Sequence, residues 1–278
     1  MYEDVIEILG NEKGGTSIIL VGVHGNERCG LEAMDTLLPN LKIQKGRMLV
    51  AYGNPKAIKQ NVRFTDVNLN RMFKPDETLS KKEKASYEYA CAQFLKTYLD
   101  QAEVLLDIHE SLTPAGDRSI IEKFIIGEEQ VKNIAQYLPL SLMVSGFDQV
   151  QPGGTDTYMN QMGKIGICVE CGYFNDAAST RTAEECINAF LVARGHVPGE
   201  LQKNPQAHIQ ITYMYTTKNN FVPTKRFGDF EEVISGQIIG KDGSDVVSAQ
   251  SDGVILFARD RKQANEEAFL FGHYTKKV

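Results

Sequence analysis

Short apolar segments alternate with longer amphipathic ones over the first two thirds of the chain, and this alternation limits the fold more than any other feature. The apolar segments are SIILVGV (17–23), RMLVAYG (47–53), AEVLLDIH (102–109) and IGICVECG (165–172). They are rich in Val, Ile and Leu, which is typical of strands buried on both faces. Apolar residues at three- and four-residue spacing predict helices over 27–38, 81–100, 128–138 and 180–195. We therefore predict an α/β fold, a sheet covered on both faces by helices.

The pattern changes after GHVPGELQKNPQ (195–206), a polar stretch with two prolines. Beyond it come short alternating runs such as HIQITYMYTT and GVILFAR, which are separated by the turn signals KDGSD and SDGV. No helix of any length is predicted there. We expect a catalytic α/β domain over residues 1–200 and a small all-β domain over residues 201–278.

Composition and charge narrow the class of protein. The 278 residues are 42% hydrophobic and 24% charged, and the formal net charge is -6. No apolar run is long enough to span a membrane, and the first residues lack the basic, apolar and small-residue pattern of a signal peptide. We therefore expect a cytoplasmic protein without a membrane partner. Clustered Lys and Arg are absent, which argues against nucleic acid as a partner. A homo-oligomer is left open.

The five cysteines are an odd number spread over a long chain, which favours reduced thiols over a disulfide framework. Cys168 and Cys171 form a C-x-x-C pair. A redox pair is disfavoured, because reactive pairs of this kind begin a helix, whereas these two residues lie in a strand-like run. On a strand their side chains point to opposite faces.

His24 and Glu27 lie where the strand over 17–23 gives way to a helix. Alone they fit two interpretations, a pair of metal ligands or a polar turn that caps the helix. His109 adds a second imidazole at the end of another buried strand, and ligands bind at the carboxyl ends of such strands. Two histidines and one carboxylate form the ligand set of catalytic zinc, with the fourth position left for water. Asp107 shares a strand face with His109 and either orients that imidazole or is a buried, hydrogen-bonded aspartate.

Hydrolysis at a metal needs a base and a group that stabilises the oxyanion. Glu170 is the lone carboxylate of an apolar strand, where burial without a partner is costly. The polar segment NVRFTDVNLNRMF (61–73) contains Arg63, Asn70 and Arg71. Asn beside Arg provides donors that suit a carboxylate, although a helix-capping Asn with a surface Arg explains the same pattern.

In chain order, the motifs HGNE, NP-x-A (54–57), RF with NLNRMF, DIH and G-x-C-V-E-x-G resemble those of the succinylglutamate desuccinylase and aspartoacylase family, over about residues 15–195. This family is related in fold to the zinc carboxypeptidases, so the resemblance implies a mixed sheet. The segment from FVPTKRF to GVILFAR is similar to the family's C-terminal barrel-sandwich.

The resemblance also implies the roles of the residues. His24, Glu27 and His109 become the ligands of one Zn2+ per chain, and Glu170 becomes the base that activates the zinc-bound water. Arg63 would polarise the scissile amide carbonyl together with the metal. Asn70 and Arg71 would clamp a carboxylate of the substrate.

The chain departs from aspartoacylase at two places. It reads NLNR, with Asn68, where aspartoacylases read DLNR. It also lacks the Arg that aspartoacylase uses shortly before its catalytic Glu, since the corresponding position is near Asn160 and no Arg lies between 118 and 181. Two interpretations follow. Lys164 could substitute for this Arg as a point charge, but we favour a substrate with a single carboxylate. Glu110, beside the predicted metal, has no assigned role.

The leading hypothesis is a zinc-dependent hydrolase that cleaves the amide bond of a small N-acyl amino acid or a related carboxylate-bearing amide. One alternative is a zinc carboxypeptidase that acts on short peptides, since Asn70 and Arg71 could hold a peptide C-terminus. Another is a non-catalytic member that binds a metal or a ligand. The presence of a base and of Arg63 argues against the non-catalytic alternative.

Overall fold

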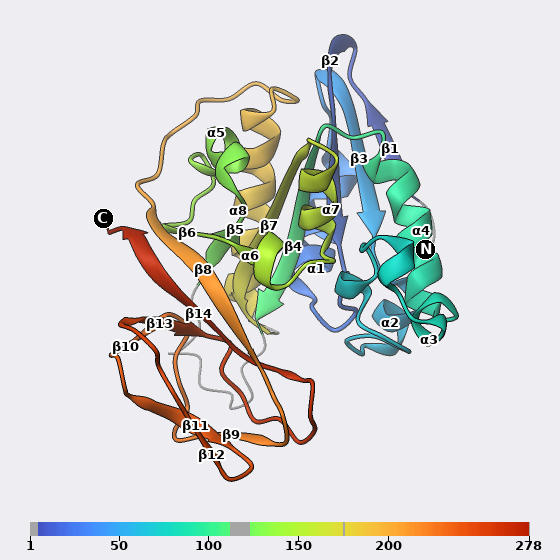
Figure 1. Cartoon of the computed structure of the whole chain (residues 1–278). Coiled ribbons are helices and arrows are strands. Elements are labelled where there is room, and N and C mark those ends of the chain that lie inside the picture. The colour runs from blue at the N-terminus through green and yellow to red at the C-terminus, as the bar shows by residue number, and fades with distance from the viewer. Residues whose placement is uncertain (1–4, 112–122, 175, 278) are drawn as a thin grey trace.

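The computed structural model describes residues 5–111, 123–174 and 176–277 (Figure 1). Within these residues, an eleven-stranded sheet is accompanied by a three-stranded one. In hydrogen-bonded order, the strands of the large sheet are β1 (Ile6–Leu9), β3 (Lys45–Tyr52), β2 (Glu12–Val21), β4 (Val104–Ser111), β7 (Ile165–Tyr173), β5 (Phe124–Ile126), β6 (Leu142–Ser145), β8 (Ala207–Thr216), β14 (Glu267–Lys276), β13 (Gly253–Leu256) and β10 (Glu231–Val233). The small sheet contains β12 (Asp245–Ser248), β11 (Ile238–Asp242) and β9 (Phe221–Pro223).

The large sheet is mixed, as the family resemblance implied. Strands β3, β2, β4 and β7 are parallel to their neighbours in that series. Strand β1 pairs antiparallel with β3, and β5 pairs antiparallel with β7. The carboxyl ends of β2, β4 and β7 therefore meet at one edge of the sheet, where a ligand site is expected.

Helices cover both faces of this sheet. The helices are α1 (Cys29–Leu37), α2 (Pro55–Gln60), α3 (Lys81–Lys84), α4 (Tyr87–Leu99), α5 (Lys132–Ala135), α6 (Phe147–Val150), α7 (Thr155–Gln161) and α8 (Ala177–Ala193), and the short 3-10 turns are η1 (Leu38–Asn40), η2 (Leu69–Arg71), η3 (Asp76–Thr78) and η5 (Glu129–Val131). Successive strand side chains point to opposite faces. In β2, Ile19 packs into the same core as Met34 of α1, whereas Ile18 packs with Leu95 of α4 and Met159 of α7.

The four predicted strands are present as β2, β3, β4 and β7. The helix predicted over 81–100 is divided into α3 and α4, because the hydroxyl of Ser86 accepts a hydrogen bond from the Tyr89 N–H at 3.1 Å and so begins a new helix. The helix predicted over 128–138 is reduced to η5 and α5. Elements such as β5, β6 and α6 were missed, because they are too short to show a period.

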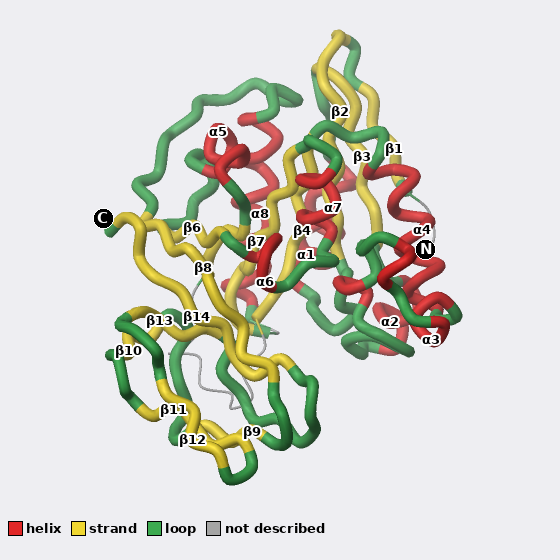
Figure 2. Tube along the Cα trace, viewed as in Figure 1, coloured by secondary structure: helices red, strands yellow, loops and turns green. Residues whose placement is uncertain are grey.

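The C-terminal part continues the large sheet. Strand β8 pairs parallel with β6, and β14, β13 and β10 follow it. Figure 2 shows strands and loops throughout the described residues 207–277, and no α-helix occurs in that range. The absence of helices there was predicted. A domain division at residue 200 stays a prediction.

The five cysteines are buried, free thiols. Cys168 packs with Phe124 and Cys171 packs with Val169, in separate cores, as expected for residues on opposite faces of a strand. Among the described residues, no helix has both the length and the apolar character that a membrane crossing requires.

Candidate metal centre and substrate pocket

The turn between β2 and α1 brings the HGNE motif to the carboxyl edge of the sheet. Its Glu27 N–H donates to the His24 carbonyl at 3.1 Å, which closes the turn. The turn lies directly against the backbone of α2, since a Cβ atom at Gly25 would be 2.1 Å from the carbonyl carbon of Ala57. Only glycine fits between these two backbones. Gly25 therefore fixes the turn that carries the side chains of His24 and Glu27.

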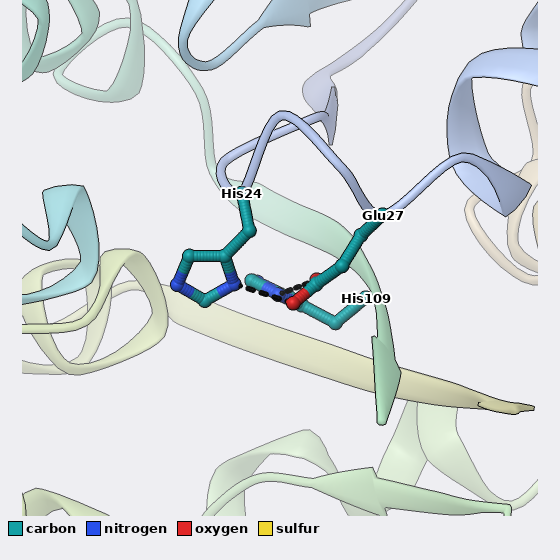
Figure 3. Close-up of side chains that lie close together, drawn as sticks. All are labelled: His24, Glu27 and His109. Carbon is teal, nitrogen blue, oxygen red and sulfur yellow. Dashed lines mark hydrogen bonds and ion pairs between the residues drawn. The ribbon is translucent and has the colours of Figure 1, made fainter. Parts of the chain in front are cut away.

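His24, Glu27 and His109 converge, as predicted (Figure 3). Nδ1 of His24 lies 2.8 Å from Oε1 of Glu27, and Nδ1 of His109 lies 2.9 Å from Oε2 of the same carboxylate. One ligand atom from each residue lies within 4.8 Å of the others. All three side chains are buried, with exposed fractions of 4%, 3% and 2%.

A second set of contacts orients the two imidazoles. Nε2 of His24 lies 3.0 Å from Oδ1 of Asn68, and Nε2 of His109 lies 3.1 Å from Oδ2 of Asp107. A divalent cation at this centre would take the lone pair of each Nδ1, which points into the site, with each Nε2 turned toward an oxygen. Nδ1 of His24 and Nε2 of His109 are both buried without a hydrogen bond. The donor atoms thus fit a divalent cation. Both interpretations of Asp107 apply, since the same oxygen that lies beside His109 also accepts a hydrogen bond from the Thr155 hydroxyl.

The charges of the centre follow from its burial. Burial lowers the pKa of His24 to about 4, which keeps this imidazole neutral. Burial also opposes charge on Glu27, but the two imidazoles outweigh it and hold the pKa of Glu27 well below its usual range. The pKa of His109 is raised well above its usual range, because Asp107 and Glu27 outweigh burial. Glu27 therefore carries a negative charge between a neutral imidazole and a protonated one.

Glu170 and Arg63 also lie at this centre. Glu170 is the neighbour of His109 in the β4–β7 pairing, and the Ser111 hydroxyl donates to its Oε2 at 2.9 Å. Burial raises the pKa of Glu170 to about 7. Nη1 of Arg63 donates to Oε1 of Glu27 at 2.7 Å. The structure thus brings both residues to the predicted metal ligands.

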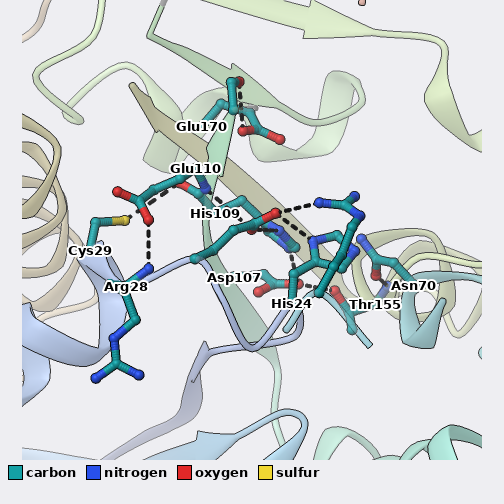
Figure 4. Close-up of polar contacts among 12 residues, drawn as sticks. His24, Arg28, Cys29, Asn70, Asp107, His109, Glu110, Thr155 and Glu170 are labelled. Carbon is teal, nitrogen blue, oxygen red and sulfur yellow. Dashed lines mark hydrogen bonds and ion pairs between the residues drawn. The ribbon is translucent and has the colours of Figure 1, made fainter. Parts of the chain in front are cut away.

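Glu110, which had no role in the sequence, contacts the start of α1 (Figure 4). Its Oε2 accepts a hydrogen bond from the Arg28 N–H at 2.6 Å. A carboxylate at a helix N-terminus is favourable, because the first N–H groups of the helix have no partner within it. Glu110 therefore stabilises the end of the helix that follows the HGNE turn.

Asn70 and Arg71 belong to η2, at the wall of the same pocket. Oδ1 of Asn70 accepts from the Thr155 N–H at 3.3 Å. The Arg71 guanidinium pairs with Glu267 of β14 through two hydrogen bonds of 3.1 and 2.9 Å. Nε2 of Gln151 donates to the same carboxylate at 2.6 Å. The guanidinium of Arg71, which was predicted to bind the substrate, is thus already paired with the carboxylate of Glu267.

These side chains line a pocket of about 480 Å³. Both parts of the chain contribute to it, since Phe257, Arg259 and Glu267 of the C-terminal part lie in the same lining as His24 and Glu170. The sequence did not predict this C-terminal contribution. A pattern of alternating strands does not indicate which of the connecting loops lies at the pocket.

The structure places Lys164 elsewhere. Its ammonium donates to the backbone carbonyls of Leu99 and Asp100 at 3.0 and 2.7 Å, at the end of α4. Asn160, at the position of the missing Arg, donates to Oδ2 of Asp148 at 2.9 Å. The alternative in which Lys164 substitutes for the missing Arg is therefore disfavoured, because its ammonium is bound to backbone carbonyls.

The fold and the site define an α/β protein with a buried His, Glu, His centre at the carboxyl edge of a mixed sheet. A model of the succinylglutamate desuccinylase/aspartoacylase catalytic domain matches residues 13–192. The chain belongs to this family.

Curated relatives include two succinylglutamate desuccinylases. The one from Chromobacterium violaceum is 29% identical over 126 residues, which are 44% of this chain and 38% of the relative. The one from Shewanella sp. (strain W3-18-1) is 34% identical over 131 residues, again 44% of this chain and 38% of the relative. The matched region thus spans less than half the length of these relatives.

Solved structures share the fold over nearly the whole chain. A succinylglutamate desuccinylase from Vibrio parahaemolyticus superposes with a TM-score of 0.80 and 18% identity, covering 99% of this chain and 87% of that one. The ectoine utilization protein EutE (DoeB) from Ruegeria pomeroyi superposes with a TM-score of 0.69 and 19% identity, covering 97% and 87%.

Proposed function

We propose that the protein is a zinc-dependent hydrolase that cleaves the amide bond of a small N-acyl amino acid or a related carboxylate-bearing amide. The observation that carries this proposal is the convergence of His24, Glu27 and His109 beside Glu170, at a pocket of about 480 Å³. Family membership supports the same reaction class. The size of the pocket suits a small substrate.

His24 and His109 would hold one Zn2+ per chain through Nδ1, with the carboxylate of Glu27 as the third ligand. Two histidines and one carboxylate are the set that catalytic zinc uses. When bound, zinc supplies a Lewis acid and lowers the pKa of a water molecule in its open position.

The chain's own residues would carry the proton and position the substrate. Glu170 would accept a proton from the attacking water and deliver it to the leaving amine, and a pKa of about 7 suits both steps. Arg63 would polarise the scissile carbonyl. Asn70 and Arg71 stay the proposed carboxylate clamp, but Glu267 competes for Arg71. Closure of the C-terminal strands into a barrel-sandwich also stays a proposal.

Metal analysis and a deacylation screen test this function. We expect about one zinc per chain, and hydrolysis of at least one acetyl, succinyl or longer acyl amino acid. Hydrolysis should disappear in His24→Ala and in Glu170→Ala, and full activity in either variant would contradict the proposal. Dipeptides assayed under the same conditions distinguish the carboxypeptidase alternative, which requires a preference for peptides with a free N-terminus.

A further inference from the structure

Among the described residues, four arginines line the pocket, and three of them have polar partners. Arg63 donates to Glu27, and Arg71 pairs with Glu267. Nε of Arg261 donates to the backbone carbonyl of Glu267. Arg63 and Arg71 are therefore paired with carboxylates, whereas Arg261 makes a single hydrogen bond to a neutral backbone carbonyl through Nε.

The fourth, Arg259, has no carboxylate of the described residues within ion-pair distance. It lies between β13 and β14, where its N–H donates to the Ala268 carbonyl at 3.1 Å and holds the segment to the sheet. Its guanidinium carbon lies 5.9 Å from the ring centroid of Phe257. An aromatic face stabilises a guanidinium but leaves its N–H groups free to donate. Arg259 thus offers unused donors to the pocket.

The backbone of this segment is bent at both ends. Phe257 has a φ of 57° and Asn265 a φ of 64°, and both side chains line the pocket. The left-handed conformation is strained for a residue such as Phe, whereas Asn adopts it more easily. Strain of this kind persists where the surrounding structure holds a functional segment in place.

Charge around Arg259 favours a single anion. Burial and the neighbouring charges of Arg261 and Arg63 lower its pKa to about 10, against the opposing effect of Glu267 and Asp229. The guanidinium therefore stays charged at neutral pH, and none of the described carboxylates forms an ion pair with it. The lining also contains the carboxyl groups of Glu170 and Glu267. They disfavour a ligand with several negative charges, such as a phosphate ester, relative to one with a single carboxylate.

We propose that Arg259, supplied by the C-terminal strands, binds the carboxylate of the acyl amino acid substrate. Its planar fork of N–H donors matches a carboxylate. Arg259 would then take over the substrate carboxylate that is assigned above to Asn70 and Arg71, because Arg71 is already paired with Glu267. The inference rests on the proposed function and gives the C-terminal part a role in specificity.

Turnover measurements test the pairing between Arg259 and the substrate carboxylate. The zinc-loaded protein is assayed with the acyl amino acid that ranks first in the deacylation screen and with its carboxamide, which lacks the charge. In Arg259→Gln, kcat/KM for the acid should fall about ten- to hundredfold, as expected for loss of a charged hydrogen bond, while kcat/KM for the carboxamide should stay within about threefold. The exposed Arg226→Gln is the matched control and should change neither value.

A binding measurement keeps the test independent of turnover. N-acetyl-L-alanine is titrated calorimetrically into Glu170→Gln and into Glu170→Gln with Arg259→Gln, and Kd should rise about tenfold in the double variant. Equal Kd values, or no binding in the single variant, would overturn the inference. It would also be overturned if Arg71→Gln, but not Arg259→Gln, removed the preference for the acid. Absence of all turnover in the unmodified protein would instead count against the proposed function.

Discussion

Replacement of Glu88 tests which interactions fix the loop that carries the NLNR motif. Its side chain lies in the first turn of α4 with an exposed fraction of 0%. The carboxylate accepts hydrogen bonds from Nδ2 of Asn54 at 3.1 Å, from the Thr65 N–H and hydroxyl at 2.6 and 2.8 Å, and from the N–H groups of Asp66 and Val67 at 3.1 and 3.2 Å. It therefore fixes the loop that leads directly into the NLNR motif.

The substitution Glu88→Gln keeps the shape of the side chain and removes half of its acceptors. The amide oxygen can keep the three donors that contact Oε1, namely those of Asn54 and Thr65. The new NH2 group then faces the N–H groups of Asp66 and Val67, which lose their acceptor. Each such loss costs about 1–3 kcal/mol, so the two together should lower the free energy of unfolding by about 2–6 kcal/mol.

The pH dependence gives the same residue a second signature. Burial alone would raise the pKa of Glu88, but the donors of Thr65 and Asn54 outweigh it and lower the pKa below the ordinary value of 4.5. A carboxyl whose pKa is lower in the folded state stabilises the fold above its unfolded pKa and loses this effect as the pH falls through the folded pKa. The difference between the parent protein and Glu88→Gln should therefore shrink below pH 4.5.

Urea unfolding followed by circular dichroism, with the metal chelated, measures the free energy of unfolding of the parent protein and of Glu88→Gln. Measurements at pH 7 and at pH 4 give the pH dependence of the difference. The exposed Glu185→Gln, on α8, is the matched control and should change the free energy of unfolding by less than about 0.5 kcal/mol. A Glu88→Gln protein that unfolds within about 0.5 kcal/mol of the parent at pH 7 would refute the reasoning. So would a difference that grows on acidification.

Three further predictions concern the centre and its pocket. Asp107→Asn should weaken zinc affinity about ten- to hundredfold, measured by competition with a chelator, because the imidazole it orients loses a carboxylate partner. Gly25→Ala should abolish zinc binding and lower the unfolding midpoint, because the new Cβ would be 2.1 Å from the backbone of Ala57; an unchanged midpoint would contradict that close approach. Glu267→Gln should tighten the binding of carboxylate ligands up to about fivefold by freeing Arg71, and weaker binding would show that this ion pair helps to form the pocket.

The local patterns of the sequence determined the framework of the site. Buried strands and amphipathic helices are set by the period of apolar residues, and parallel strands bring their carboxyl ends to one edge. His24 follows one such strand, and His109 and Glu170 lie near the ends of two others, so their convergence could be predicted before any coordinate was known. Asp107 was predictable for the same reason, since a residue two positions away shares a strand face.

Only the tertiary structure decided which charged groups are paired. Glu267 lies 196 positions from Arg71, and no period in the chain relates them. Lys164 is near the site in sequence order, yet its ammonium contacts backbone carbonyls at the end of α4. The availability of a charge depends on its neighbours in space, because a guanidinium or carboxylate that is paired within the chain no longer offers its donors or acceptors to a ligand. For that reason the convergence of His24, Glu27 and His109 could be predicted from the sequence. The guanidinium of Arg259, which forms no ion pair among the described residues, was found only in the folded chain.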